Sequence, residues 1–148
     1  MRYINVYHGE RLRAMAPEFL YELCKEREQE NKVNISFRLP SWEQHVAFIE
    51  RRPYRYWYIL QLEGLDAWIG YISATTHNEI GIVLLRQYRG KGFGSEAVRG
   101  FTDKFKPLPE IASVRPGRWL ANIHPENAPS QRMFTKLGFT LKQQTYEL

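Results

Sequence analysis

The chain begins with a segment of alternating apolar and polar residues and continues into two helical patterns. Residues 2–7 alternate and predict a first strand. Residues 17–31 predict a helix, because Pro17 stands at its start and apolar residues recur at helical spacing before a charged tail. Ser41, with Gln44 three residues later, is typical of a capping box, so a second amphipathic helix is expected to begin there.

The middle of the chain is rich in aromatic and β-branched residues. Residues 56–62 and 67–75 predict a hairpin whose turn is Glu63-Gly64-Leu65-Asp66. A second tight turn, His77-Asn78-Glu79, leads into residues 80–85, which predict a buried strand. Two neighbouring antiparallel connections are therefore expected in the centre of the fold.

Helices and strands alternate in the last third of the chain. A helical pattern follows three alternating glycines and ends at the prolines of residues 107–109. Residues 119–123 predict a strand, residues 127–137 a helix stopped by Gly138, and residues 139–148 a last strand. Hairpins mixed with strand–helix–strand crossovers predict an α+β fold, with a mixed sheet and helices on its faces.

The composition is that of one globular domain. The 148 residues are 43% hydrophobic and 25% charged, which predicts a single domain over residues 1–148. The longest apolar run, residues 80–85, is far shorter than the roughly 20 residues of a membrane span. The first residues lack an apolar core of signal-peptide length, and Cys24 is the one cysteine. We therefore expect a reduced, cytoplasmic protein that does not bind membranes.

The net charge of +5 is concentrated in one stretch. Residues 86–118 hold eight Lys and Arg against three Asp and Glu, whereas residues 56–85 hold none against three. Such an excess attracts anionic partners. Nucleic acid, a phosphate-rich cofactor and a merely solvated basic face all remain open on charge alone.

Candidate chemistry begins in the basic segment Arg89-Gly90-Lys91-Gly92-Phe93-Gly94-Ser95. It lies between a predicted strand and a predicted helix. The first N–H groups of a helix lack intrahelical partners, and the helix dipole is positive there. Glycines allow close approach of the backbone to a ligand, so this loop suits phosphate or pyrophosphate.

Two other phosphate motifs fit this loop less well. A P-loop requires Ser or Thr after its lysine, but Gly92 follows Lys91. The segment from Gly92 to Ala97 fits a relaxed dinucleotide pattern, yet Glu110, near the expected acidic position, lies in a proline loop rather than at a strand end. A glycine turn with a solvated basic face is the simplest alternative.

The glycine loop resembles the Arg/Gln-x-x-Gly-x-Gly/Ala signature of the GNAT superfamily of acyl-CoA N-acyltransferases. A second segment, from Asn127 through Ser130 to Gly138 and Phe139, resembles the Asn-x-x-Ser helix and closing Gly-Phe of the same family. Both motifs occur in the family's order and spacing. The resemblance implies a GNAT fold, with a twisted, mostly antiparallel sheet of six to seven strands, splayed central parallel strands and about four helices.

The resemblance also implies acetyl-CoA as co-substrate, bound through its pyrophosphate by the backbone of the glycine loop. The strand before the loop splays from its neighbour in this family and pairs with the pantetheine arm, and the second motif lines the other side of the cleft. The cofactor-binding residues implied in this way are Val83, Leu84, Leu85, Arg89, Gly90, Lys91, Gly92, Phe93, Gly94, Ser95, Asn127, Ser130 and Phe134.

The activity implied is transfer of acetyl to a primary amine that attacks the thioester directly, without an acyl-enzyme. Many relatives carry a tyrosine, thought to protonate the leaving thiolate, where this chain has Phe134. Phe134 has no proton to give, and a core aromatic is the simpler interpretation of it. A thiol with a pKa near 8.5 is a fairly good leaving group. Ser130 or a water is the candidate acid.

The attacking amine must be neutral, so a base or water relay is needed. Glu79, which opens the strand leading into the cleft, is the candidate base, and a solvated turn glutamate is the alternative. His124 is a weaker candidate that also suits a loop histidine. His8, His45 and His77 have no ligand-like spacing with one another or with Cys24, so no metal site is predicted.

The acceptor is less well defined. The segment from Ser41 to Ile49 resembles a stretch in relatives that acetylate amino-sugar nucleotides and, more loosely, polyamines or ribosomal-protein N-termini, although a capped amphipathic helix explains it too. A small amine such as an amino sugar is the acceptor we expect, with a protein N-terminus as the alternative. Family resemblance alone does not choose among these.

Three further hypotheses concern partners. The segment from Arg51 to Tyr58 interleaves bases with aromatics, as nucleic-acid stacking surfaces do, but its charge ends at Arg55 and nucleic-acid binding is not expected. Phe134 favours a catalytically silent acyl-CoA-binding module as an alternative to an enzyme. An apolar surface expected at Tyr54, Tyr56 and Trp57 suggests a homodimer.

Overall fold

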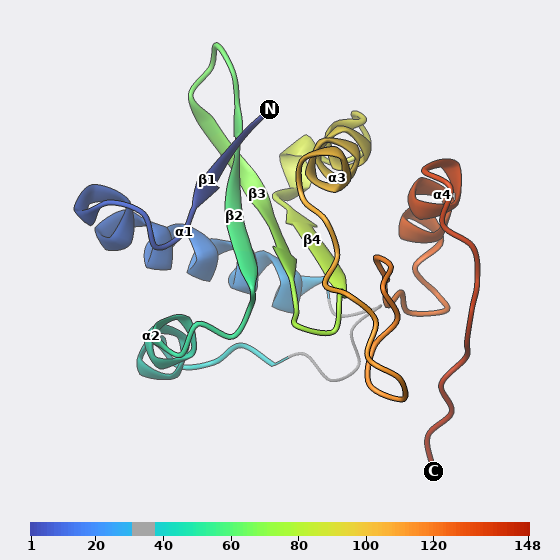
Figure 1. Cartoon of the computed structure of the whole chain (residues 1–148). Coiled ribbons are helices and arrows are strands. Elements are labelled where there is room, and N and C mark those ends of the chain that lie inside the picture. Colours follow the sequence, from blue (N-terminus) through green and yellow to red (C-terminus); the bar gives the residue numbers. More distant parts are fainter. Residues whose placement is uncertain (31–37) are drawn as a thin grey trace.

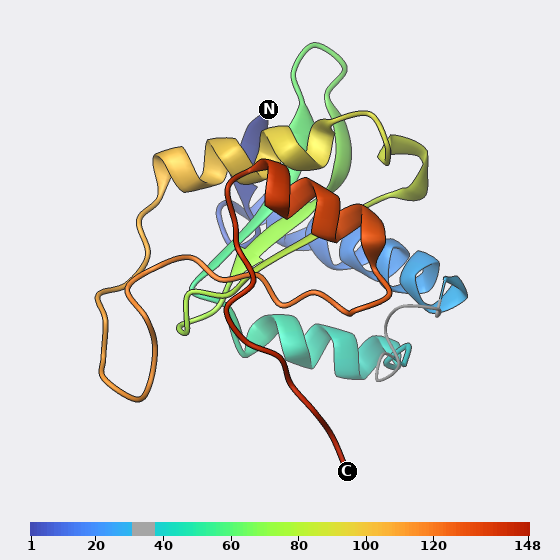
Figure 2. The same ribbon diagram turned by 90° about the vertical axis from the view of Figure 1, so that its right-hand side faces the viewer.

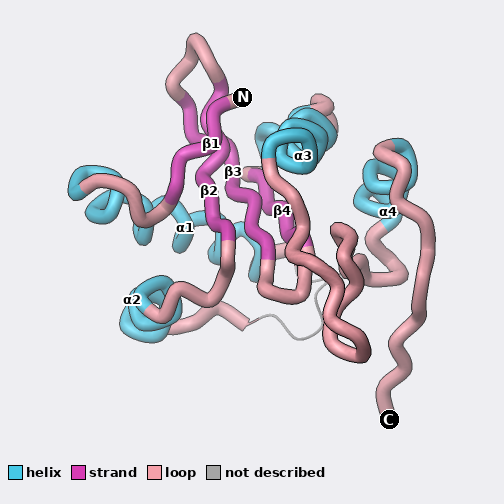
Figure 3. Tube along the Cα trace, viewed as in Figure 1, coloured by secondary structure: helices cyan, strands magenta, loops and turns pink. Residues whose placement is uncertain are grey.

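A four-stranded antiparallel sheet forms the centre of the computed structural model, which describes residues 1–30 and 38–148. Its order is β1 (Arg2–Asn5), β2 (Tyr56–Leu62), β3 (Ala67–Ala74) and β4 (Ile80–Leu84) (Figures 1 and 3). β2 and β3 form the predicted hairpin, with a register shift at Leu60/Gln61. The second predicted turn joins β3 to β4, so the central strands match the sequence prediction.

Two pairs of helices cover the two faces of this sheet (Figures 1 and 2). On one face α1 (Glu10–Gln29) and α2 (Trp42–Glu50) bury a core that contains Leu20, Leu23 and Ile59. On the other face lie α3 (Phe93–Lys104) and α4 (Ala128–Lys136). Neighbouring β2 residues, Ile59 and Leu60, enter opposite cores because side chains alternate along a strand.

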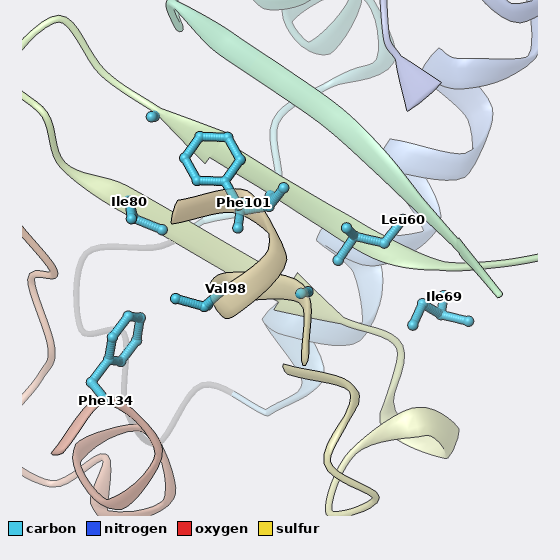
Figure 4. Close-up of a cluster of buried hydrophobic side chains, with 9 residues drawn as sticks. Leu60, Ile69, Ile80, Val98, Phe101 and Phe134 are labelled. Atoms are coloured by element: carbon cyan, nitrogen blue, oxygen red, sulfur yellow. The ribbon is translucent and has the colours of Figure 1, made fainter. Parts of the chain in front are cut away.

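The core between the sheet and α3 is the larger one. Leu60, Ile69 and Ile80 come from the strands, while Val98 and Phe101 come from α3 and Phe134 from α4 (Figure 4). Their relative exposures are at most 5%. Burial of a large apolar side chain contributes about 1.5–3 kcal/mol, so this cluster fixes α3 and α4 against the sheet.

The helix α1 begins earlier than predicted. It starts at Glu10 after Gly9, and Pro17 lies inside it rather than at its start. Proline removes one helical hydrogen bond, but burial of Ala16 and Leu20 on either side of it holds the helix together. Its predicted end, Asn31, lies outside the described residues.

The other helix ends follow the sequence signals. Ser41 and Gln44 form the predicted capping box at α2, in which each side chain bonds to the other residue's backbone. Asn127 caps α4, and Gly138 after its end adopts φ 94°, the left-handed conformation expected of a C′ glycine. α3 starts at Phe93, directly after the glycine loop.

Two predicted strands, and hence the sheet of six to seven strands, are wrong. Within the described residues, segment 119–123 makes a single parallel bridge, between Leu120 and Glu79, and segment 139–148 forms no regular structure. Leu141 and Tyr146 are 80% and 87% exposed, so the alternating apolar residues of the last segment bury little surface. Without a buried face, alternation alone does not stabilise a strand.

The aromatic surface expected for a homodimer is not present as predicted. Trp57 is 5% exposed and packs edge-on against Tyr54 and Phe48, while Tyr56 contacts Phe101 and Phe105. Trp57 is therefore a core residue, whereas Tyr54 and Tyr56 are half-buried, and the homodimer stays a prediction. No helix in the described part of the chain is long and apolar enough to cross a membrane.

Candidate active site

β4 is the last strand of the sheet, and its outer edge has no backbone partner after Ile80 among the described residues. The carbonyl of Glu79 accepts from the N–H of Thr75, and the N–H of Leu85 donates to Ile69, so the odd-numbered residues bond to β3. The N–H and C=O groups of the even-numbered residues point to the outer edge of the sheet. Ile80 donates to the carbonyl of Leu120 at 2.7 Å, but no later backbone bond joins the two segments among the described residues.

This geometry divides the three strand residues that sequence analysis assigned to the cofactor. Of Val83, Leu84 and Leu85, only Leu84 directs its peptide groups to the open edge, and its carbonyl accepts a bond from Arg89 Nε at 2.9 Å. Ile82 shares that edge, although sequence analysis did not select it. Two residues of β4 thus present backbone groups to which an extended amide chain can pair.

The glycine loop connects this open edge to the N-terminus of α3. A short 3₁₀ turn, Arg86–Tyr88, is followed by Arg89 in an extended conformation and by Gly90 and Gly92 at φ 71° and 84°. Gly92 is the N-cap of α3 and makes no side-chain cap bond. The first N–H groups of the 12-residue helix therefore face a position suited to an anion.

The three glycines serve two different purposes. A Cβ atom added at Gly90 or Gly92 would meet no atom within 4 Å, so space is open beside both. A Cβ at Gly94 would lie 2.9 Å from Met133 Sδ on α4. Gly94 permits close packing of α3 on α4, whereas the other two supply left-handed backbone and an open approach.

The cations of the loop differ in their partners. Arg89 donates to Glu30, at the C-terminal end of α1, and Arg86 Nε donates to the other oxygen of the same carboxylate at 2.6 Å. Glu26 also accepts from the backbone N–H of Arg86 at 2.8 Å. Lys91 is exposed and has no ion pair within the described ranges. Lys91 is thus the loop cation best placed to meet an incoming phosphate.

The two arginines alter the acidity of Glu30. Its burial alone would raise the pKa, but hydrogen bonds and charges from Arg89 and Arg86 outweigh burial and hold the pKa below its usual value of 4.5. Glu30 is therefore ionised at neutral pH and connects α1 to the start of the glycine loop. This contact spans about 60 residues of sequence and was not predicted.

The second motif forms the wall beside α3. Asn127 Oδ1 accepts from the N–H of Ser130 at 3.3 Å, which makes Asn127 a helix cap, and Ser130 itself is half-buried. Phe134 is 5% exposed and packs edge-on against Phe139. Phe134 is thus a core residue in addition to any role beside a cofactor. Ser95, in the first turn of α3, is half-buried as well.

The carboxylate of Glu79 is held by two neutral donors. Thr75 Oγ1 donates to one oxygen at 3.1 Å, and Asn122 Nδ2 donates to the other. The Glu79 side chain is half-buried at the point where β4 parts from segment 119–123. Sequence analysis selected Glu79 but missed Asn122, because no local pattern relates residues that are 43 positions apart.

In the described part of the chain, the histidines and other metal-ligand side chains do not form a metal site. His124 Nδ1 accepts from the N–H of Glu126 at 3.1 Å, as expected of a loop histidine. His45 is buried with its Nε2 2.8 Å from the carbonyl of Pro17, and burial lowers the pKa of its ring. Among the described residues no group of His, Cys, Asp and Glu is arranged to hold a metal ion.

Comparison with known proteins identifies the family. The sequence profile of the acetyltransferase (GNAT) domain matches residues 11–140. The chain belongs to the GNAT acetyltransferase family. This match includes the glycine loop and the second motif. The family's two signatures therefore coincide with the loop at the N-terminus of α3 and with the wall beside that helix. No curated protein sequence matches this GNAT domain.

Solved structures share the fold of this GNAT domain. A domain from Methanocaldococcus jannaschii DSM 2661 has a TM-score of 0.73 at 20% identity, covering 99% of this chain and 93% of that one. The putative acetyltransferase yncA from Salmonella typhimurium, solved with its cofactor acetyl-CoA, has a TM-score of 0.67 at 19% identity, covering 97% and 83%. An acetyltransferase from Thermus thermophilus has a TM-score of 0.62 at 17% identity, covering 94% and 86%.

Proposed function

We propose that this GNAT domain transfers an acetyl group from acetyl-CoA to a small primary amine. The observation that carries the proposal is the cradle of Gly90 and Gly92, which opens onto free space at the uncapped N-terminus of α3. Backbone N–H groups at a helix start bind phosphate oxygens well. The adjacent edge of β4, with the peptide groups of Ile82 and the N–H of Leu84 directed outward, supports binding of an amide-containing arm.

The residues present fit such a co-substrate. Lys91 and the N–H groups from Gly92 onward would hold the pyrophosphate, and Leu84 and Ile82 would pair with the pantetheine amides. Asn127 and Ser130 would line the opposite wall. Val83 and Leu85 point their peptide groups toward β3, so we propose side-chain contacts for them rather than backbone pairing.

The proposed reaction moves one acetyl group and one proton. The amine nitrogen forms a bond to the thioester carbonyl carbon, the carbon–sulfur bond breaks, and the products are an amide and the CoA thiol. Glu79 is the proposed base that takes the proton from the amine, directly or through water. Ser130 or a water is the proposed donor to the leaving sulfur, because Phe134 cannot supply a proton.

The acceptor we propose is a small amine such as an amino sugar. The segment from Ser41 to Ile49 lends this little support, because Ser41 caps α2 and His45 bonds to Pro17. An amine panel therefore has to include a peptide with a free N-terminus beside amino sugars and polyamines. Release of free thiol with an amino sugar, but not with the peptide, is the expected result.

Calorimetric titration with acetyl-CoA tests the cofactor. One-to-one binding is expected, with NADH inert. Gly92→Glu places bulk and a negative charge in the cradle and should weaken binding at least a hundredfold. Gly64→Glu is a matched control, because Gly64 has the same φ of 84° and equally open surroundings in the hairpin turn. Equal affinity in both variants would contradict the assigned cradle.

A catalytically silent module is the second candidate, favoured by Phe134 alone. Acetyl-CoA binding without thiol release on any amine of the panel would support it. Turnover of one amine would exclude it. Absence of binding to any CoA species would contradict both candidates.

A further inference from the structure

A small cavity lies at the end of the sheet opposite the glycine loop and near β1. Its volume is about 270 Å³, and its lining residues come from the end of β1, the start of β2 and the segment after α2. The glycine loop follows the other end of β4, at the opposite edge of the sheet. Any ligand of the cavity is therefore separate from one in the cradle.

The walls of this cavity offer hydrogen-bond donors and no carboxylate. Arg52 and Arg55 contribute two guanidinium groups and Asn5 an amide. His8 adds an imidazole ring with a further N–H donor. The acidic residue Glu50 lines a neighbouring cavity of about 370 Å³ instead. A donor-rich, cationic lining selects a ligand that accepts hydrogen bonds and carries negative charge.

Arg52 is held in place although it makes no ion pair with any described residue. Its guanidinium lies 4.4 Å from the ring centre of Tyr7, whose hydroxyl donates to the carbonyl of Ile49 at 2.7 Å. Its backbone has φ 51°, a conformation that costs a non-glycine residue about 1 kcal/mol. Because the Arg52 guanidinium is held beside an open cavity without a counter-charge, it can bind an anion there.

Trp57 forms a fixed wall of this cavity. It is only 5% exposed, and its Nε1–H is buried without a hydrogen-bond partner among the described residues. Its ring is fixed by edge-on contacts with neighbouring aromatics, including Tyr7 and Tyr54. A ligand bound in the cavity therefore lies beside this ring and changes the environment of its indole N–H.

We propose that this cavity binds the oxyanion group, carboxylate or phosphate, of a small molecule. The site is independent of the acetyl-CoA cradle and of the proposed acetyl transfer. Its volume of about 270 Å³ suits a small acid or a phosphate ester. Arg52 and Arg55 supply the charge, and the amide of Asn5 supplies a hydrogen-bond donor.

Nuclear magnetic resonance of the indole N–H groups tests the site. The Gly92→Glu protein is used, so that anions bound in the cradle do not contribute. Inorganic phosphate and succinate are titrated separately at constant ionic strength, with Trp57→Phe used to assign the resonance. A saturable shift of the Trp57 signal, with those of Trp42, Trp68 and Trp119 unchanged, is expected. Comparison of the two titrations then shows whether the site prefers phosphate, prefers the carboxylate of succinate or binds both.

A pair of arginine variants provides the control. Arg55→Gln removes a wall cation and should weaken binding at least tenfold. Arg51→Gln removes the same charge from the same segment, but Arg51 does not line the cavity, so affinity should change less than twofold. Both residues are exposed, and neither change threatens the fold. No saturable shift with either anion, or equal losses in the two variants, would overturn the proposal.

Discussion

Single side chains decide how the candidate cleft works, and Glu79 is the most informative of them. Its carboxylate is fixed by Thr75 and Asn122 at the point where β4 separates from segment 119–123. Two neutral donors orient the group without supplying a counter-charge. A carboxylate oriented in this way can accept a proton, which suits its proposed role as the base.

Glu79→Gln should lower kcat/KM by about 10²–10⁴-fold, as expected when a general base is lost. Glutamine preserves the side-chain shape and still offers an oxygen to Asn122. Steady-state rates of thiol release measure the effect. Thr75→Val, which removes one bond that orients the carboxylate, should lower the rate less. A Glu79→Gln rate within about twofold of wild type would reject Glu79 as the base.

At the residue scale, the sequence groups the residues of the candidate site but does not separate their structural roles. The glycine motif locates the cradle, yet only the structure separates Gly92, which opens onto free space, from Gly94, which packs on Met133. The capping role of Asn127 was likewise hidden within a family motif. Motif spacing records which residues occur together, whereas the distance to neighbours distant in sequence determines what each one does.

At the scale of elements, the turn before β4 anchors the long segment after α3. Asn78 is 1% exposed, and its Nδ2 donates to the carbonyls of Leu108 and Pro116 while its Oδ1 accepts from the N–H of Leu108. Its backbone also bonds to Thr75 and Leu120. One buried amide thus connects β4, loop 106–118 and the bridge to segment 119–123. The sequence predicted this turn but not the anchor.

Asn78→Ala should reduce the free energy of unfolding by at least about 3 kcal/mol. Three side-chain hydrogen bonds are lost at about 1 kcal/mol each, and unpaired loop groups and the φ of 65° add to the cost. Urea denaturation measures the change. Asn78→Gly tolerates the backbone conformation and should lose slightly less. His77→Ala, at the exposed neighbouring position, should stay within about 0.5 kcal/mol. A loss below about 1 kcal/mol for Asn78→Ala would contradict the anchoring role.

Element prediction succeeded where local and long-range forces agree. The hairpin, α2 and α4 carry both a periodic pattern and turn or capping residues, and all three form as predicted. Residues 139–148 carry the alternation without a partner surface and remain irregular. Pro17 is the opposite case, because packing of α1 on the sheet overrides a local helix-breaking signal. Local sequence propensity determines secondary structure only where the burial of apolar side chains does not oppose it.

At the scale of the whole molecule, the acidic end of α1 connects its helix layer to the loop that leads into α3. Glu26 and Glu30 reach past the edge of β4 to Arg86 and Arg89, directly before the cradle. The helices beside which we expect the amine to bind are thereby attached to the loop proposed for the cofactor. Since no periodicity or motif links these positions, this connection lay beyond sequence analysis.

The connection through Glu30 predicts a specific pH dependence of stability. Because the folded-state pKa of Glu30 is depressed, the native protein holds this proton less tightly than the unfolded chain, whose pKa lies near 4.5. The stabilisation is therefore complete above about pH 4.5 and is lost as the pH falls through the lower, folded-state value. Glu30→Gln should be less stable than wild type at pH 7, and this difference should shrink in acid.

Urea denaturation at pH 7, 4.5 and 3.5 measures that difference. Glu28→Gln is a matched control, because Glu28 is exposed on the same helix and has no ion pair within the described ranges. Its effect should be small at every pH. High salt should also narrow the gap at pH 7, since water and ions screen the exposed Arg86. A gap between Glu30→Gln and wild type that stays constant from pH 7 to 3.5 would show that the ion pairs do not connect α1 to the cradle, and the two helix layers would then be joined only through the sheet.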